Sequence, residues 1–515
     1  MAKYDCTTCD EIIDDTDHEH MDYCRDHRHE LLLMAEDQSN IDKDTISLTM
    51  DEYQKKLSAN RSYLIEVIEK EFPNRSFAII AALSVKAQQM IFGITQVFTL
   101  ILMGNPSSYK STILEIVSIL PDCYVSDSFT PKSFVSHSAN SKKNELGKVD
   151  LLPRIRHKTL ITSELAPLFS GNPDQLLEYF GMLTRILDGR GFQSDSGVHG
   201  RRGYTGDYSF MWLGAVVEIP HRVWKLLGNL GAKMYFLRLP NDIDSADEKK
   251  IKIRQSLREE SYSKKIESAK VAIKRFWAVI EKNPYQEDGK IIWDKESDNP
   301  QTVDKIIDLA MLLAKLRGTI PTWYTGQSDS GGTNYNYETP IIEQPDRASN
   351  AFYNLARGHA VLWGRNYITD EDLPVVVAVA LSSASRDRVE LFKKLLECNG
   401  KQNTEQFMES SKVSRSTALK EMKSLSILGL VDLYDEEYNT KYVRTIKLKK
   451  EYDWFLSLEF QKHMSRFDAS LIGKNSKLSQ QDNLENNTMC TNDEQKKIDV
   501  DFDDNVPTYD GAAEF

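Results

Sequence analysis

The sequence predicts a mixed α/β fold with a parallel sheet at its centre, and two observations predict it. Short apolar runs with the length of buried strands alternate with longer stretches of helical periodicity through the middle of the chain. One of these runs leads through a turn into a lysine and two hydroxyl residues, where a helical stretch begins. Strand, loop and helix in this order form the context in which backbone amides and a helix N-terminus bind phosphate.

Five apolar runs are expected to form the sheet, because each is short and bounded by polar or turn-forming residues. Five such strands with helices between them imply an α/β nucleotide-binding sheet. In chain order they are Val97–Met103, Cys123–Val125, Lys158–Thr162, Phe210–Val217 and Lys233–Leu239.

The loop after the first strand matches the phosphate-binding pattern G-x-x-x-x-G-K-[ST] at Gly104, Lys110 and Ser111, and departs from it at Tyr109, where the pattern has glycine. Lys110 supplies a point charge, and the Ser111 hydroxyl is placed to reach Mg²⁺. We therefore expect ATP and Mg²⁺ to bind here; a strand-turn-helix without a ligand is the alternative. The expected nucleotide-binding residues of the loop are Gly104, Asn105, Pro106, Ser107, Ser108, Tyr109, Lys110, Ser111 and Thr112.

The third expected strand runs directly into Ser163 and Glu164. NTPases of this kind end the equivalent strand in two acidic residues, one near magnesium and one that polarises the attacking water. Glu164 is therefore expected to be the catalytic base, while Ser163 replaces the carboxylate that would order the metal. A solvated loop residue is the alternative for Glu164.

A glycine-rich stretch, Leu187–Asp207, separates the third and fourth strands. Its recurring glycines and alternating polar residues predict a long, twisted hairpin. Arg190, His199, Arg201 and Arg202 are expected to be exposed on it and to contact a DNA backbone without reading sequence. A solvated loop is the alternative.

The N-terminus carries two pairs of soft ligands, Cys6 with Cys9 and Cys24 with His27. This spacing predicts a structural tetrahedral Zn²⁺ site, because each pair spans one tight turn. Three neighbouring histidines could replace one ligand, and an acidic, histidine-rich tail without metal is the alternative. The histidines are His18, His20 and His29.

Composition limits the function classes. The chain has 515 residues, 40% of them apolar, which is enough for two to four domains with real cores. The net charge of -12 excludes a globally basic surface, so any DNA site must be a local patch or channel. Six cysteines and the absence of an apolar signal or spanning segment predict a reducing, cytoplasmic setting without a membrane partner. Nucleoid association is expected together with DNA binding.

The C-terminal third predicts a winged helix. A short helix, Asn403–Glu409, precedes a second helix, Ser414–Leu428, and two strand-like segments follow. The outward face of the second helix is basic, which fits a recognition helix in a DNA groove, although winged helices that bind only proteins share this pattern. Its basic residues are Lys412, Arg415, Lys420 and Lys423.

Between these segments, helical periodicity and a Thr369 N-cap with Asp372 predict a helical lid, and the Gly, Ser and Asn-rich segment Gly326–Asn336 predicts a loop. The acidic end of the chain predicts a disordered tail that could dock on a partner. The expected organisation is 1–50 zinc-binding segment, 51–90 helical lead-in, 91–240 nucleotide-binding core, 241–300 helical insertion, 301–396 helical lid, 397–460 winged helix and 461–515 tail.

Taken together, these features resemble an AAA+ ATPase, and minichromosome-maintenance-type helicases of archaea, phages and mobile elements are the most similar group. The resemblance covers roughly residues 95–395. It is carried by the loop Gly104–Thr112, the strand ending in Glu164, the hairpin before Phe210, and the helical run with Arg347, Leu355–Ala360, Arg365 and Ile368–Asp372.

The resemblance implies homo-hexameric rings with ATP between subunits and DNA in the central pore, contacted by the hairpin. By position, Lys110 and Ser111 would bind phosphate and magnesium, Glu164 would be the base, and Arg347 would be a lid arginine that senses the γ-phosphate. Helicases of this type tolerate alanine at the position of Tyr109, so the tyrosine ring must point away from the phosphates.

Two further positions depart from the family. The trans-acting arginine finger falls on Lys233, with Arg238 or Arg222 as substitutes, and lysine lacks the planar fork that grips a phosphoryl group. Where a polar sensor is expected, the strand ends in Val216 and Val217, and the nearest polar candidate is Glu218.

Two functions follow as hypotheses. The first is a DNA-dependent ATPase of the AAA+ class, a ring-forming helicase or replication initiator. The second is a DNA-binding regulator or helicase loader whose degenerate site binds nucleotide without turnover.

Overall fold

The computed structural model describes residues 3–6, 11–14, 31–34, 49–136, 146–196, 200–231, 233–240, 247, 250–251, 253–254, 257, 262–327, 333–438 and 441–464. The chain forms two compact units, Met1–Glu52 and Tyr53–Phe515. Within the described ranges, no helix combines the length and the apolar character needed to cross a membrane.

The first unit contains a small antiparallel sheet with the strand order β2-β1-β3. Cys6 ends β1, whereas the other expected zinc ligands, Cys9, Cys24 and His27, lie outside the described residues. Among the residues that are described, no group of three or more His, Cys, Asp or Glu side chains could hold a metal ion. The strands are β1 (Lys3–Cys6), β2 (Glu11–Asp14) and β3 (Leu31–Met34).

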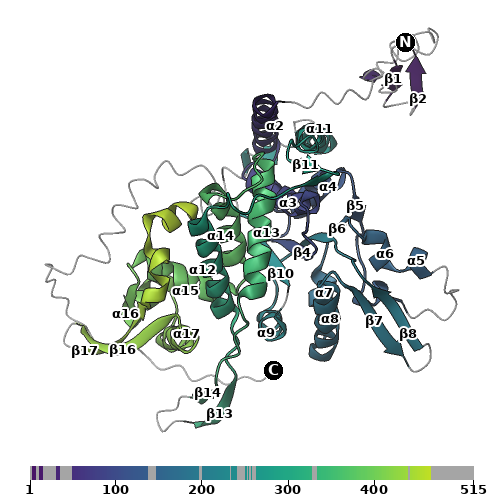
Figure 1. Cartoon of the computed structure of the whole chain (residues 1–515). Coiled ribbons are helices and arrows are strands. Elements are labelled where there is room, and N and C mark those ends of the chain that lie inside the picture. The colour runs from purple at the N-terminus through teal and green to yellow at the C-terminus, as the bar shows by residue number, and fades with distance from the viewer. Residues whose placement is uncertain are drawn as a thin grey trace. The chain divides into compact units, whose positions relative to one another are not determined.

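A five-stranded parallel sheet forms the centre of the second unit, which confirms the predicted mixed α/β fold (Figure 1). The strand order is β10-β4-β9-β6-β5, and every neighbouring pair is parallel. Each strand falls within the run predicted for it. The strands are β4 (Phe98–Met103), β5 (Cys123–Val125), β6 (Thr159–Thr162), β9 (Met211–Val216) and β10 (Met234–Arg238).

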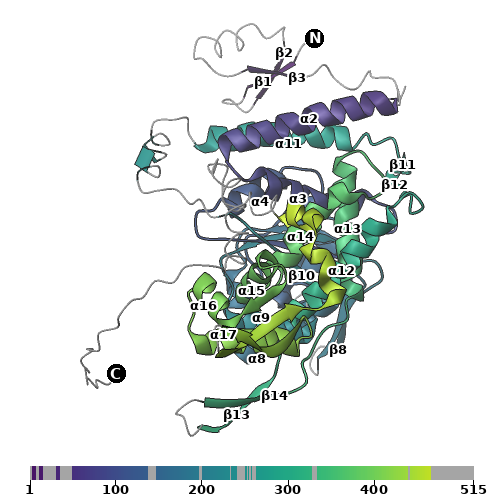
Figure 2. The same ribbon diagram turned by 90° about the vertical axis from the view of Figure 1, so that its left-hand side faces the viewer.

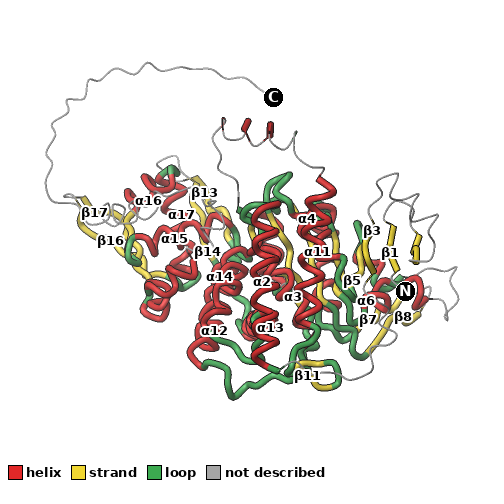
Figure 3. The backbone as a smooth tube through the Cα atoms, turned by 90° about the horizontal axis from the view of Figure 1, so that it is seen from above, coloured by secondary structure: helices red, strands yellow, loops and turns green. Residues whose placement is uncertain are grey.

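One face of the sheet is covered by α3, which packs on β4 and β9, and by α4, which packs on β5, β6 and β9. Helix α3 is buried along its whole length except near its start, and α11 lies against α4. From above, α2, α3, α4 and α11 form one group (Figure 3). Their bounds are α2 (Met50–Glu71), α3 (Ser76–Ala87), η2 (Gln88–Met90), α4 (Lys110–Ser118) and α11 (Tyr262–Ile280).

The opposite face carries an aromatic-rich core in which Trp212, Phe180 and Phe236 are fully buried. Helices α8 and α9 supply one side of this core, and short elements between β5 and β6 supply the other. The elements are η3 (Pro131–Ser133), α5 (Leu146–Val149), α6 (Leu151–Ile155), α7 (Ala166–Phe169), α8 (Pro173–Ile186) and α9 (His221–Leu230).

A second helical group follows the sheet, with α13 packed on α3 and α12, and α14 packed on the edge strand β10 (Figure 2). The hydroxyls of Ser382 and Ser383 accept hydrogen bonds from the backbone N–H groups of Arg238 and Phe236, respectively. These donors on the outer side of the edge strand β10 are therefore satisfied. Thr369 and Asp372 form the predicted capping box. The elements are β11 (Gln286–Glu287), β12 (Lys290–Ile291), α12 (Pro300–Arg317), α13 (Asp346–Leu362), η4 (Asp370–Asp372), α14 (Leu373–Ser382) and α15 (Arg386–Glu397).

The prediction of a loop over Gly326–Asn336 is wrong for Gly326–Gln327 and for Thr333–Asn336, while 328–332 lie outside the described residues. Strands β13 (Thr322–Gln327) and β14 (Thr333–Tyr337) pair as an antiparallel hairpin, with a register irregularity beside Gly326. The turn-forming residues of this segment suggested a loop, but antiparallel backbone pairing between the two strands stabilises an extended conformation. Helices therefore do not account for the whole of 301–396.

The last described part is a three-stranded antiparallel sheet, β15-β17-β16, with two helices against it. Asn403 and Ser414 cap the two helices through their side chains, as expected of such residues. Residues 465–515, which include the predicted acidic tail, lie outside the described ranges. The elements are β15 (Lys401–Asn403), α16 (Thr404–Ser411), α17 (Arg415–Ile427), β16 (Val431–Tyr438), β17 (Lys441–Leu448) and η5 (Lys450–Leu456).

Candidate nucleotide-binding site

The loop 104–109 lies at the carboxyl end of β4, between the ends of its two neighbours. The Gly104 amide donates to the Val216 carbonyl at 3.3 Å, and the Leu239 amide donates to the Met103 carbonyl at 2.7 Å. The chain leaves β4 toward β5 on one side, but leaves β9 toward β10 on the other. Such a reversal of direction opens a crevice at the carboxyl edge of an open parallel sheet, where ligands bind.

Lys110 is folded back over this loop. Its Nζ donates to the carbonyls of Gly104 at 2.8 Å and Asn105 at 2.7 Å, and to the Ser108 hydroxyl at 3.3 Å. Burial lowers the pKa of Lys110, and the charge of Glu164 partly offsets this. The ammonium is therefore centred on the loop where a phosphate group would need a counter-charge.

Ser111 and Glu164 lie close to Lys110, although they belong to different strand-to-helix connections. The Ser111 hydroxyl faces the Ser163 carbonyl at 3.5 Å, and a Glu164 carboxylate oxygen accepts the Ala166 amide at 2.8 Å at the start of α7. Glu164 is otherwise exposed. The structure thus brings together the Lys110 ammonium, the Ser111 hydroxyl and the solvent-exposed Glu164 carboxylate. They lie at the carboxyl ends of β4 and β6, and β9 lies between these two strands.

The surroundings of Tyr109 explain how the loop accommodates a tyrosine where the pattern has glycine. Its backbone is left-handed, with φ 67° and ψ 15°, which is the conformation that favours glycine. The ring centroid lies 5.5 Å from that of Phe72 in an edge-on arrangement, and the Arg75 guanidinium lies 5.6 Å from it. Arg75 is buried and its Nε also donates to the Ser108 carbonyl at 3.1 Å. The ring is therefore held against the α2–α3 connection.

Phe72 and Arg75 were not predicted to belong to the site. The sequence assigned 51–90 to simple packing, and no spacing rule links Arg75 to a loop more than thirty residues away. The one available signal was Tyr109 itself, because a bulky side chain in a glycine position needs surroundings that hold it there.

Tyr262 is the third aromatic residue at this corner. Its hydroxyl is hydrogen-bonded to the Thr112 hydroxyl in the first turn of α4, and its ring centroid lies 6.3 Å from that of Phe72. Lys270 of the same helix pairs with Glu115 of α4 at 3.2 Å. Helix α11 is thus fixed along α4 at two points.

Arg238 and Glu218 form an ion pair across the carboxyl ends of β10 and β9. Arg238 lies directly opposite Met103 in the parallel register, next to the loop of its own chain. Its other terminal nitrogen is buried and has no hydrogen-bond partner among the described residues. Arg238 therefore lies beside the loop of its own chain, whereas the finger that the family resemblance implies would reach a neighbouring subunit.

Lys233 and Arg347 lie at the other edge of the sheet, before β10. Lys233 is 3% exposed and donates to the Thr184 carbonyl at 2.8 Å and to the Asp188 carboxylate. Arg347 donates to the Gly231 carbonyl at 2.6 Å beside a cavity of about 370 Å³. Burial lowers the pKa of Lys233, and Asp188 opposes this shift. As a finger, Lys233 would first have to leave this internal ion pair.

The predicted hairpin is formed by β7 (Gly191–Ser196) and β8 (Gly200–Thr205), which pair in antiparallel register. Arg190 and Arg201 are exposed, as predicted. Arg202 is not fully exposed, because its guanidinium turns back to donate to the Ser136 carbonyl at 3.4 Å. His199 lies outside the described residues.

The hairpin is anchored by Asp150. This buried carboxylate accepts the Ser136 amide at 2.9 Å, the Ser136 hydroxyl at 2.6 Å and the Tyr204 hydroxyl at 2.8 Å. The hairpin leaves the sheet at its amino edge, on the side of Lys233 and Arg347.

All four basic residues predicted for DNA contact on and before α17 are exposed. Lys423 also lies 4.4 Å from the centre of the Tyr337 ring, so the hairpin β13–β14 contacts this face. The residues are Lys412, Arg415, Lys420 and Lys423.

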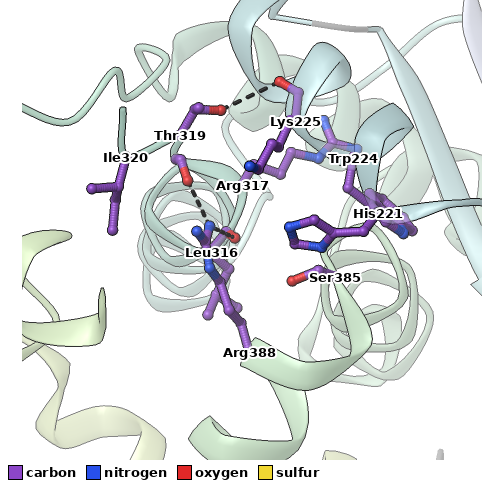
Figure 4. A pocket seen from close by; sticks show the side chains of 10 residues that line it. His221, Trp224, Lys225, Leu316, Arg317, Thr319, Ile320, Ser385 and Arg388 are labelled. Atoms are coloured by element: carbon purple, nitrogen blue, oxygen red, sulfur yellow. Dashed lines mark hydrogen bonds between the residues drawn. The ribbon is translucent and has the colours of Figure 1, made fainter. Parts of the chain in front are cut away.

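A second, small cavity lies where α9, α12 and α15 meet, with a volume of about 40 Å³ (Figure 4). Arg388 crosses it and donates to the carbonyls of Leu316 at 2.9 Å and Gly318 at 2.5 Å, which satisfies the C-terminus of α12. The labelled side chains close a helix junction. This cavity is therefore a packing gap between helices, and it is not part of the site at the carboxyl edge of the sheet.

No protein-family model matches the chain, and no curated protein matches it. Among solved structures, "The A form apo structure of NrS-1 C terminal region-CTR" is similar at 9% sequence identity and a TM-score of 0.21, over 77% of this chain and 76% of that chain. A likeness of this size carries no functional argument, so the site has to be interpreted from its own residues.

Proposed function

We propose that the protein is a DNA-dependent ATPase of the AAA+ class, acting as a ring-forming helicase or a replication initiator. The observation that carries the proposal is the cluster of Lys110, Ser111 and Glu164 at the carboxyl edge of the parallel sheet. A point charge, a metal-reaching hydroxyl and a carboxylate facing solvent are the groups that phosphoanhydride hydrolysis needs in one place.

Each residue has a distinct role in this proposal. The loop amides and Lys110 bind the phosphates, and Lys110 exchanges the carbonyls of Gly104 and Asn105 for phosphate oxygens. Ser111 would hold Mg²⁺, which supplies charge neutralisation at the phosphates when bound. Glu164 accepts a proton from, or orients, the attacking water. Arg238, with one guanidinium nitrogen still unpaired, adds positive charge beside the loop of its own chain.

The position of Arg347 supports an oligomer. It is bonded to Gly231 before β10, whereas Lys110 follows β4, so one strand length separates the two edges. A five-residue strand such as β10 spans about 16 Å, which is too far for one side chain to cross. Arg347 can therefore sense a γ-phosphate only in the site of a neighbouring subunit. A homo-hexameric ring is the form that the family resemblance implies.

The exposed Arg185 is an additional candidate for the finger. It lies on the same edge as Lys233 and Arg347, is largely exposed, and touches Asp188 only at 3.6 Å. An exposed guanidinium can reach a neighbour without breaking an internal ion pair, and its fork suits a phosphoryl group.

DNA would be contacted at two places. The hairpin β7–β8 presents Arg190 and Arg201, and α17 presents basic residues in the arrangement of a winged helix. A zinc site at Cys6, Cys9, Cys24 and His27 and a docking role for the acidic tail are part of the same proposal. Metal analysis of the carefully reduced protein tests the zinc site, and finding no zinc removes it.

The central experiment measures ATP hydrolysis with and without single-stranded DNA. Wild type is compared with Lys110→Ala, Glu164→Gln and, as a control, Lys132→Ala, because Lys132 is exposed and paired only with Glu178. We expect DNA-stimulated turnover that Lys110→Ala and Glu164→Gln abolish and Lys132→Ala retains. ATP binding should be lost in Lys110→Ala and kept in Glu164→Gln.

A nucleotide-binding DNA regulator or helicase loader is the second candidate. It is favoured by Ser163, which stands where a metal-ordering carboxylate is expected, and by the internal ion pair of Lys233. ATP binding that depends on Lys110, with no turnover in wild type under any DNA condition, would establish this function and exclude the enzyme.

A further inference from the structure

We infer that the ring of Tyr262 is the surface on which the base of the bound nucleotide stacks, so that α11 acts as the base-binding element of the site. This inference rests on the proposed nucleotide-binding function and adds a residue from outside the phosphate loop. Helix α11 follows the last strand of the sheet and lies in the segment 241–300, which was expected to be a helical insertion.

The first argument is position. The Tyr262 hydroxyl bonds to Thr112, two residues after Lys110 and in the first turn of the helix whose N-terminus faces the loop. Phosphates held by Lys110 and Ser111 leave the ribose and base close to this turn, because a single sugar connects the base to the phosphates. Tyr262 therefore borders the space that the base has to occupy.

The second argument is exposure combined with fixation. Tyr262 is 51% exposed, which is unusual for an aromatic side chain that is also hydrogen-bonded and packed. Phe72 meets it at 86° between ring planes, so the two rings touch edge to face. The Lys270–Glu115 pair fixes the same helix farther along α4. An aromatic ring held in place with half of its surface open loses little conformational entropy when a flat ligand stacks on it.

The other rings of this corner are not free for stacking. Phe72 is 2% exposed, and Tyr109 is covered on two sides by Phe72 and the Arg75 guanidinium. Tyr109 and Phe72 thus position the loop and support Tyr262, and among these three described rings Tyr262 is the most open. Stacking tolerates every base, so this contact predicts affinity for nucleosides in general and little selection among them.

The test compares two ligands that differ in the base. Equilibrium dissociation constants are measured for ATP and for inorganic tripolyphosphate with wild type, Tyr262→Ala and Tyr262→Phe. Tyr442→Ala is the matched control, since this tyrosine is 75% exposed and lies on β17, outside the five-stranded sheet that carries the site. Thermal unfolding of each variant checks that folding is unchanged.

We expect Tyr262→Ala to weaken ATP binding about 10-fold or more, within the range of one base stacked on an aromatic ring, and to leave tripolyphosphate binding unchanged. Tyr262→Phe keeps the ring and should retain most of the ATP affinity. An equal loss for both ligands would show that Tyr262 acts only through Thr112 and the loop, and no loss for ATP would show that the base lies elsewhere; either result overturns the inference. Lys110→Ala separates the two proposals, because its failure to weaken either ligand would reject the nucleotide site itself.

Discussion

The two edges of the central sheet differ in how their charged residues are held. At the carboxyl edge, the described partners of Lys110 are two backbone carbonyls and a hydroxyl, and the Glu164 carboxylate faces solvent. At the amino edge, Lys233 is bonded to Asp188, and Arg347 to a backbone carbonyl beside an open cavity.

In the proposed oligomer, this difference would let each edge supply part of a site shared with a neighbouring subunit. Among the described residues, Lys110 has no carboxylate at hydrogen-bond distance and Glu164 has no cation there, although Arg238 and Glu218 form an ion pair at the same edge. The amino edge presents arginines and the hairpin β7–β8 toward the outside. Two copies placed edge to edge would complete one site, and four experiments examine that comparison.

The largest effect is expected from Arg347→Ala. If Arg347 acts on the site of a neighbour, hydrolysis should fall by roughly 10³-fold, the range of an arginine that stabilises a transferring phosphoryl group. Mixing Arg347→Ala with Lys110→Ala subunits should then restore measurable turnover, because an interface can combine an intact lysine with an intact arginine. Turnover is followed by phosphate release at fixed total protein. A mixture no more active than its two components would place Arg347 outside the site.

Asp188→Asn examines the closed ion pair of the amino edge. It leaves the Lys233 ammonium buried without a carboxylate, and we expect a loss of about 2 kcal/mol in the free energy of unfolding at neutral pH, below the range of fully buried pairs because Asp188 is partly exposed. Burial already lowers the pKa of Lys233, and Asp188 raises it, so the variant should lower it further.

The pH dependence has a definite sign. Between the lowered pKa of Lys233 in the folded state and the ordinary lysine value of about 10.4, the unfolded state binds more protons, so stability rises with pH. The destabilisation by Asp188→Asn should therefore be greatest at neutral pH and shrink toward pH 10.4. Urea unfolding across this range measures it. A loss that does not change with pH would assign the effect to packing.

Substitutions of Tyr109 measure the cost of the left-handed backbone conformation at this position of the carboxyl edge. Tyr109→Ala and Tyr109→Gly both remove the ring contacts with Phe72 and Arg75, but only glycine relieves the left-handed conformation. We expect the glycine variant to be more stable than the alanine variant by about 1 kcal/mol. Equal stabilities in thermal unfolding would mean that the loop changes conformation once the ring is gone.

The smallest effect is expected from the hairpin. Arg201→Ala removes one exposed cation, so the slope of log binding constant against log salt concentration for single-stranded DNA should become shallower by about 0.7, the value for one phosphate contact. Lys70→Ala, in α2 and largely exposed, is the control. An unchanged slope with Arg201→Ala would show that the hairpin does not contact the DNA backbone through this residue.

Much of the fold could be predicted from local pattern. The five strands and the cap at Thr369 follow from periodicity and from residues whose effect lies within one turn. The prediction for Gly326–Asn336 failed because strand pairing, and not composition, decides the conformation of its described residues. The zinc ligands and the tail lie mostly outside the described residues and stay predictions.

The sequence by itself determined that a lysine and two hydroxyls follow the first strand of an α/β sheet, and that a carboxylate follows the third. These are properties of neighbours along the chain. Only the tertiary structure decided that Tyr109 rests on Phe72 and Arg75, that Tyr262 borders the loop, and that Lys233 is closed by Asp188. Those contacts join segments tens of residues apart, and packing between elements, which leaves no local signature, fixes them.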